Sequence, residues 1–206
     1  ADCLAVTSNG ELAEIADGEN LDRIEVPQGM PPRAAAAYLF LPLPFALGDV
    51  VGYDVPEDGT VEKACSHLED LVTELDPERE QNPALSMARS LEARLPILYG
   101  SQEVSSVLAR RFKNQVNENA KTFAVSNVLP EMNHNEVMAI DDLEKTPEDY
   151  GVVFLRDRGE HGRVQKRFTI LEDLLEDSVG YIGSIESRGR SLLARFLTLM
   201  LHTDYV

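Results

Sequence analysis

The hydrophobic and polar positions of this chain follow two periods that alternate along its length. Short apolar runs of strand composition recur at residues 2–8, 23–26, 95–100, 123–128, 151–157 and 179–185. Between them, apolar residues recur at helical spacing, at 11–19, 34–48, 61–75, 77–92, 102–120, 161–177 and 188–204. Strands that alternate with helices are typical of a parallel sheet covered on both faces. The pattern therefore predicts an α/β fold.

The pattern also divides the chain into three parts. Residues 1–53 hold two strands and two helices, of which the apolar run at 34–48 is expected to be buried and bent at Pro42 and Pro44. Because two strands rarely form a stable sheet alone, this part is expected to be the later portion of a larger α/β domain. Residues 54–92 are predicted to form a helical connector that begins with a linker at 54–60. Residues 93–206 are predicted to form a further α/β domain.

Composition excludes some classes of protein. The 206 residues are 43% apolar, enough to bury a core, and no apolar run approaches the roughly 20 residues that cross a bilayer. A net charge of −17, with acids in nearly every segment, argues against nucleic-acid binding, which needs clustered cations. The acidic surface fits either an ordinary protein of the cytoplasm or one adapted to high salt, where screening relieves self-repulsion.

Cysteine usage and the start of the chain favour the cytoplasm. Cys3 and Cys65 are the only cysteines, too few for a disulfide framework or a thiolate metal site. The chain begins with Ala1 and shows no basic region followed by an apolar core, so no signal peptide is expected in it.

The stretch NENAKTFAVSNVLPEMNHNE, at 117–136, places asparagines around one carboxylate and one imidazole. Glu118 falls in the last turn of the predicted helix at 102–120, on the same face as Val104 and Leu108. It is therefore expected to point inward, where burial and the helix dipole both favour the protonated form, as suits a general base. The alternative is a surface glutamate at a frayed helix end.

His134 lies in a polar loop after Pro130, beyond the end of a predicted strand. Loops at the carboxyl ends of parallel strands are where α/β folds place ligands. Glu131 and His134 also form an E-x-x-H pattern, but Pro130 and the asparagines argue against the helix that such a metal motif needs. No metal site is expected. The other histidines are interpreted as structural or turn residues, namely His67, His161 and His202.

Gly100 and Ser101 join a predicted strand to the helix that follows it. Backbone N–H groups and the helix dipole favour an anion such as phosphate at such a junction. The alternative is that the turn simply needs small residues, and Gln102 stands where a glycine would strengthen the phosphate interpretation.

Three segments together resemble one family. The run NENAK…SNVLPEMNHNE, the segment PPRAAAAYLF at 31–40 and the segment SRGRSLLARFLTLMLHTDYV at 187–206 are similar to the bifunctional phosphoglucose/phosphomannose isomerases, which carry two sugar isomerase (SIS) domains. The resemblance implies a three-layer, flavodoxin-like SIS domain with a parallel sheet at 93–206, plus part of another SIS domain at 1–53. It further implies that the family's S-x-S-G-N-T phosphate loop and last helix lie outside this chain.

The resemblance implies roles for three residues. Glu118 corresponds to the base that moves a proton between C1 and C2 of the open-chain sugar. His134 corresponds to the histidine that assists ring opening and comes from the neighbouring subunit of a homodimer with a shared active site. Arg33 corresponds to the arginine that stabilises the enediolate. Lys121, the last residue of N-E-N-A-K, joins Gly100 and Ser101 as a candidate substrate contact, and no cofactor or metal is implied.

The function expected from this resemblance is an aldose–ketose isomerase. It would interconvert glucose 6-phosphate or mannose 6-phosphate with fructose 6-phosphate through a cis-enediol, which needs a base, a proton donor and a cation facing the developing oxyanion. The asparagines would serve as neutral partners that orient these groups. The alternatives are a noncatalytic phosphosugar-binding SIS protein, or a dimerisation half whose active site is completed elsewhere.

Overall fold

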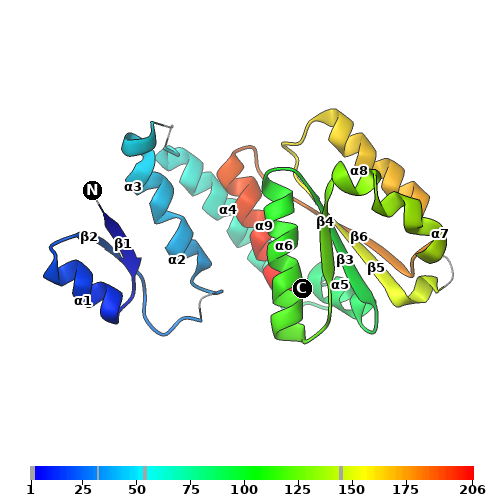
Figure 1. Ribbon diagram of the computed structural model, residues 1–206, viewed down its shortest axis with the longest axis horizontal. Coiled ribbons are helices and arrows are strands. Elements are labelled where there is room, and N and C mark those ends of the chain that lie inside the picture. The colour runs from blue at the N-terminus through cyan, green and yellow to red at the C-terminus, as the bar shows by residue number, and fades with distance from the viewer. Residues whose placement is uncertain (1–2, 32, 53–54, 144–145) are drawn as a thin grey trace. The chain divides into compact units, whose positions relative to one another are not determined.

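The computed structural model describes residues 3–31, 33–52, 55–143 and 146–206 of the chain. The chain forms two compact units, Ala1–Glu57 and Asp58–Val206. Figure 1 shows the helices and strands of each unit. Within the described residues, none of the helices combines the length and the apolar character that crossing a membrane requires.

The first unit contains a two-stranded parallel sheet and three helices in its described part. Strand β1 (Leu4–Thr7) pairs with β2 (Asp22–Glu25), and α1 (Glu11–Gly18) connects them. Helices α2 (Ala36–Phe40) and α3 (Pro42–Val51) follow. The expected order of strand, helix, strand and helix is confirmed for this unit.

The apolar run at 34–48 differs from its prediction in two ways. It forms two helices that meet at Leu41, because Pro42 occupies the first turn of α3, where a missing N–H costs nothing. It is also largely exposed in α2, which contains no buried residue and whose Tyr38 and Phe40 are 48% and 47% exposed. Apolar composition alone thus predicted burial wrongly for α2.

The second unit is built on a four-stranded parallel sheet of order β4-β3-β5-β6. Its strands are β3 (Leu95–Ser101), β4 (Val125–Leu129), β5 (Tyr150–Arg156) and β6 (Tyr181–Glu186). The predicted parallel α/β fold is confirmed, with each strand within two residues of its expected start. All four strands carry their carboxyl ends to one edge of the sheet.

Helices cover both faces of this sheet (Figure 1). Its long helices are α4 (Asp58–Glu74), α5 (Pro83–Leu91), α6 (Val104–Gln115), α8 (Gly162–Leu175) and α9 (Leu192–Tyr205). Its short elements are η1 (Val116–Ala120), η2 (Glu131–Asn133), η3 (Glu136–Ala139), α7 (Ile140–Leu143) and η4 (Pro147–Asp149).

Alternate residues of the central strands point to opposite faces and build two cores. Leu98 and Val153 pack with residues of α5, α6 and α9 on one face. Tyr99 and Phe154 pack with residues of α8 and of the segment after β4 on the other. This alternation follows from the twofold period of a strand, and it makes the second unit a three-layer sandwich.

The helices of the region predicted to be a connector begin at positions that the hydrophobic pattern did not show. Helix α4 begins at Asp58, inside the predicted linker, where an acidic side chain in the first turn is favoured by the helix dipole. The helix predicted at 77–92 begins only at Pro83, because Asn82 caps it. The Asn82 side chain accepts a hydrogen bond from the Leu85 N–H at 3.0 Å and donates to the Leu75 carbonyl at 2.7 Å.

Candidate functional site

Glu118 and His134 lie at opposite ends of strand β4. Glu118 belongs to η1, which precedes β4. The side chain of the neighbouring Asn117 accepts a hydrogen bond at 2.8 Å from the N–H of Ala124, the residue just before β4. His134 follows η2, beyond the carboxyl end of the strand. Five residues of strand at about 3.3 Å each separate the two ends by about 16 Å. The fold of one chain therefore keeps the two residues apart.

Glu118 does not point inward, so that expectation is wrong. Its side chain is exposed, although Leu108 and Phe112 of the preceding helix are buried. The α-helix ends at Gln115 and continues as a π-helical turn, in which each residue advances by less than 100°. The face extrapolated from the α-helical period therefore misses Glu118, and the half-buried Asn117 takes the position toward β4.

Lys121 caps the carboxyl end of η1. Its backbone adopts a left-handed conformation at φ 56°, and its ammonium group donates a hydrogen bond to the Glu118 carbonyl at 2.7 Å. This hydrogen bond holds the amine close to the turn that carries Glu118, although Lys121 is exposed. The contact shown is a cap of the helix end, and a contact with substrate remains a prediction.

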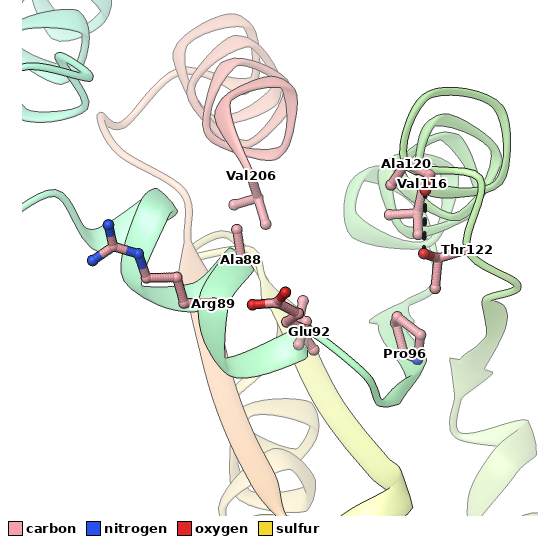
Figure 2. A pocket seen from close by; sticks show the side chains of 9 residues that line it. Ala88, Arg89, Glu92, Pro96, Val116, Ala120, Thr122 and Val206 are labelled. Atoms are coloured by element: carbon pink, nitrogen blue, oxygen red, sulfur yellow. Dashed lines mark hydrogen bonds between the residues drawn. The ribbon is translucent and has the colours of Figure 1, made fainter.

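A pocket of about 330 Å³ borders the same turn. Figure 2 shows Val116, Ala120 and Thr122 on one side of it and Ala88 and Val206 on the other. Glu118 is not among the residues that line it. The lining is mainly apolar, so this pocket is a poor match for a charged sugar phosphate.

The loop that carries His134 is anchored on both sides of it. Met132, two residues before His134, is only 2% exposed and packs in the core that contains Tyr99 and Phe154. Glu136, two residues after, accepts hydrogen bonds from the Tyr99 hydroxyl at 2.6 Å and from the Asn127 amide. The His134 side chain itself is exposed. The expectation of a loop beyond a strand end is confirmed, with short 3₁₀ turns η2 and η3 inside it.

Burial controls the ionisation of Tyr99. Burial raises the pKa of Tyr99 far above its usual value, and the hydrogen bond to Glu136 and the charge of Glu136 raise it further. The hydroxyl therefore remains protonated at any physiological pH. It acts as a permanent donor to the Glu136 carboxylate.

The junction at Gly100 and Ser101 is filled by a carboxylate of the chain itself. Ser101 is 3% exposed and its hydroxyl donates a hydrogen bond to Glu160, while the Ser105 hydroxyl donates to the same carboxylate oxygen at 2.9 Å. A Cβ on Gly100 would lie 2.4 Å from the backbone of Ser105, so the close packing of β3 against α6 requires a glycine. An incoming phosphate would meet a negative charge here.

Sequence reasoning missed Glu160. It lies in the loop after β5, in the run D-R-G-E-H-G, and its partners come from the end of β3 and the start of α6. Burial raises the pKa of Glu160, while the hydrogen bonds from Ser101 and Ser105 oppose that rise. No local sequence pattern indicated this contact, because only the strand order places β5 beside β3, where the loops at their carboxyl ends converge.

The remaining candidates lie elsewhere. Arg33 belongs to the first unit. It is half-buried and begins the turn before α2. His161 caps α8, since its Nδ1 accepts a hydrogen bond from the Arg163 N–H at 3.1 Å. Burial, aided by the charge of Arg188, lowers the pKa of His202 to about 4, so the ring is neutral and structural.

Comparison with known proteins gives a family. The model of the bacterial phospho-glucose isomerase C-terminal SIS domain matches residues 80–206. The chain is 36% identical over 208 residues to the bifunctional phosphoglucose/phosphomannose isomerase of Caldicellulosiruptor bescii, covering all of this chain and 61% of that protein. It is 33% identical over 202 residues to the enzyme of the same name from Thermoplasma volcanium, covering 98% of this chain and 60% of that protein.

Solved structures agree on the fold. A glucose-6-phosphate isomerase like protein from Thermus thermophilus superposes with a TM-score of 0.58 at 20% identity, over 96% of this chain and 66% of that one. Glucosamine-6-phosphate deaminase from Thermotoga maritima superposes with a TM-score of 0.62 at 11% identity, over 99% of this chain and 60% of that one.

The match covers all of this chain and only part of its relatives. The chain spans about three fifths of the length of the curated relatives named above. The family model covers more than half of the chain, including β3, η1, the His134 loop and α9. The chain belongs to the family of the bacterial phospho-glucose isomerase C-terminal SIS domain.

Proposed function

We propose that this chain is part of an aldose–ketose isomerase that interconverts glucose 6-phosphate or mannose 6-phosphate with fructose 6-phosphate through a cis-enediol. The observation that carries the proposal is the family match over the segment that presents Glu118 and His134. Relatives that align with the whole chain are named bifunctional phosphoglucose/phosphomannose isomerases. The protein that contains this chain is proposed to act in the cytoplasm.

Glu118 is proposed to move the proton between C1 and C2 of the open-chain sugar. A carboxylate in this role must reach the substrate and be shielded from water when it does. Glu118 is exposed in the single chain. The shielding is therefore proposed to come from other surfaces, either further parts of the full-length protein or a second copy of it.

His134 is proposed to reach the same sugar from the partner subunit of a homodimer. The separation of about 16 Å across β4 supports this arrangement, because a hexose phosphate is too short to contact both ends of the strand in one chain. In a twofold dimer each site would then combine Glu118 of one subunit with His134 of the other.

Two further parts complete the proposed site. Arg33 is proposed to face the oxygen that becomes negative in the enediolate, where a cation stabilises the transition state. The substrate phosphate is proposed to bind away from the Gly100–Ser101 junction, because Glu160 already occupies that position with a carboxylate. Lys121 stays a candidate contact with the sugar phosphate.

Substitution of Glu118 tests the proposed base in the full-length protein. Glu118→Gln keeps the size of the side chain and removes the proton acceptor, so kcat should fall by about 10²–10⁴-fold with a small change in KM. A coupled assay for each sugar phosphate measures this. The matched control is Glu131→Gln, an exposed acid of the same region, which should keep wild-type turnover. Unchanged turnover in Glu118→Gln would remove this residue from the role of base.

Mixing two inactive variants tests the shared site. A heterodimer of Glu118→Gln with His134→Ala contains one site with both residues intact and one with neither. Random reassociation of equal amounts should therefore restore about a quarter of wild-type activity, whereas each variant alone stays inactive. No recovery, with differently tagged subunits co-purifying to show that mixed dimers form, would place both residues of a site in one subunit. Sugar phosphates that bind the full-length protein without interconversion would favour a noncatalytic SIS protein instead.

A further inference from the structure

We propose that Glu136 is a positioning residue that holds His134 in place for catalysis, an inference that rests on the proposed function. Glu136 is the last residue of N-H-N-E, and the roles inferred above leave it unused. Its carboxylate joins the His134 loop to two strands of the sheet.

The two hydrogen-bond donors are fixed by the register of the sheet. Tyr99 of β3 lies directly opposite Asn127 of β4. Side chains at paired positions project from the same face, so the Tyr99 hydroxyl and the Asn127 amide converge on one carboxylate. Tyr99 is 5% exposed and stacks on Phe154 with ring centroids 5.9 Å apart, so its hydroxyl has little freedom to move.

The orientation of the Asn127 amide is fixed as well. Its Oδ1 accepts a hydrogen bond from the Val128 N–H at 2.8 Å, so its Nδ2 is the atom that faces Glu136. Both groups around the Glu136 carboxylate are therefore donors. A carboxylate, which only accepts, satisfies both donors. An amide in its place still accepts from one of them, but it satisfies the Tyr99 hydroxyl only if that hydroxyl turns and accepts from the amide N–H.

Met132 and Glu136 anchor the loop on either side of His134 and hold its backbone in place. Met132 is buried on the amino side of the histidine, and the backbone between the anchors is tied by short turns. The His134 N–H donates to the Glu131 carbonyl at 2.9 Å, and the Asn135 side chain accepts from the Glu136 N–H at 2.7 Å. The imidazole thus projects into solvent from a backbone held at two points, which suits a group that must meet a substrate bound by another subunit.

A double-mutant cycle in the full-length protein tests this role. Glu136→Ala removes both contacts and should lower kcat by about 10–100-fold with KM changed by less than about twofold, because a displacement of about 1 Å is enough to cost this much. In the His134→Ala background the same change should alter kcat by less than about twofold, since there is no imidazole left to position.

Graded variants and a control sharpen the test. Glu136→Gln keeps an acceptor for the Asn127 amide but presents an N–H to the Tyr99 hydroxyl, which must turn from donor to acceptor, so its loss of kcat should fall between those of wild type and Glu136→Ala. Tyr99→Phe, which removes only the hydroxyl, should show a similar intermediate loss that disappears in the His134→Ala background. Glu131→Ala, a change of an exposed acid in the same loop, should leave the kcat of each background unchanged. Circular dichroism and thermal unfolding establish that each variant is folded.

The outcomes separate this proposal from the proposed function. If His134→Ala lowers turnover but Glu136→Ala and Glu136→Gln do not, the positioning role is wrong and the isomerase stands. Equal losses from Glu136→Ala in both backgrounds would show a general structural role and also overturn the proposal. If His134→Ala keeps wild-type turnover, both this proposal and the role of His134 in the proposed function fail.

Discussion

Glu160 is a partly buried acid whose surroundings act on its charge in opposite directions. The loss of water around its carboxyl favours the protonated form, whereas the hydroxyls of Ser101 and Ser105 stabilise the carboxylate. Its Oε2 is buried with no hydrogen-bond partner among the described residues. Burial has the larger effect, so the pKa of Glu160 is raised in the folded chain.

This raised pKa predicts how stability changes with pH. Between the usual value of 4.5 and the raised pKa, the folded chain binds more protons at Glu160 than the unfolded chain does, so the free energy of unfolding falls as pH rises through that window. Glu160→Gln cannot titrate and should become more stable relative to wild type as pH rises from about 4 to about 7. Urea unfolding at several pH values measures the difference.

The control for this measurement is Glu176→Gln, a change of an exposed acid at the end of α8. Its stability relative to wild type should vary less over the same range of pH. A Glu160→Gln variant that loses stability relative to wild type as pH rises would show that the hydrogen bonds from the two serines outweigh burial.

The junction between β3 and α6 shows how one residue sets the distance between two elements. Gly100 lies near the end of β3, where the strand passes the first turn of α6. The nearest backbone atoms of Ser105 leave no room for a side chain there. Close packing here brings the serine hydroxyls and the Glu160 loop together. The same packing sets the course of α6, and with it the place of η1 and Glu118.

Gly100→Ala should therefore destabilise the chain. The added Cβ would lie 2.4 Å from two backbone atoms, so strand and helix must move apart at a cost of at least about 2 kcal/mol in the free energy of unfolding. Gly59→Ala is the matched control, because Gly59 lies in α4 with nothing within 4 Å of its added Cβ, and it should be neutral or slightly stabilising. Equal stability of the two variants in denaturant unfolding would contradict the tight junction.

The two units of the molecule differ in what holds them together. In the second unit, core clusters on both faces of the sheet contain several fully buried leucines and phenylalanines. In the described part of the first unit, the buried apolar side chains are small, namely Ala5, Ala13, Ala16, Val26 and Ala35. Its sheet has two strands, which rarely suffice for independent stability.

Residues 58–206 expressed alone should fold cooperatively. Their four-stranded sheet and its helices bury their own cores, so denaturant should produce a single sigmoidal transition by both circular dichroism and tyrosine fluorescence. Residues 1–57 alone should show no such transition. A gradual, non-cooperative loss of structure in the 58–206 fragment would mean that the second unit depends on the first.

The sequence by itself determined the order of the elements, the parallel sheet and the loop that carries His134. These follow from local properties, because a twofold or 3.6-residue period, a proline or a cap depends on neighbours along the chain. The resemblance found in N-E-N-A-K and N-H-N-E is confirmed by the family match. The roles of the individual residues stay predictions.

Only the tertiary structure decided which side chains meet. The π-helical turn moved Glu118 off the face that a regular helix predicts, and strand order brought Glu160 to Ser101 and Tyr99 to Glu136. The crossover through α6 placed η1 and the His134 loop at opposite ends of β4. Such contacts join residues tens of positions apart, and they depend on register and packing, which a local pattern does not encode.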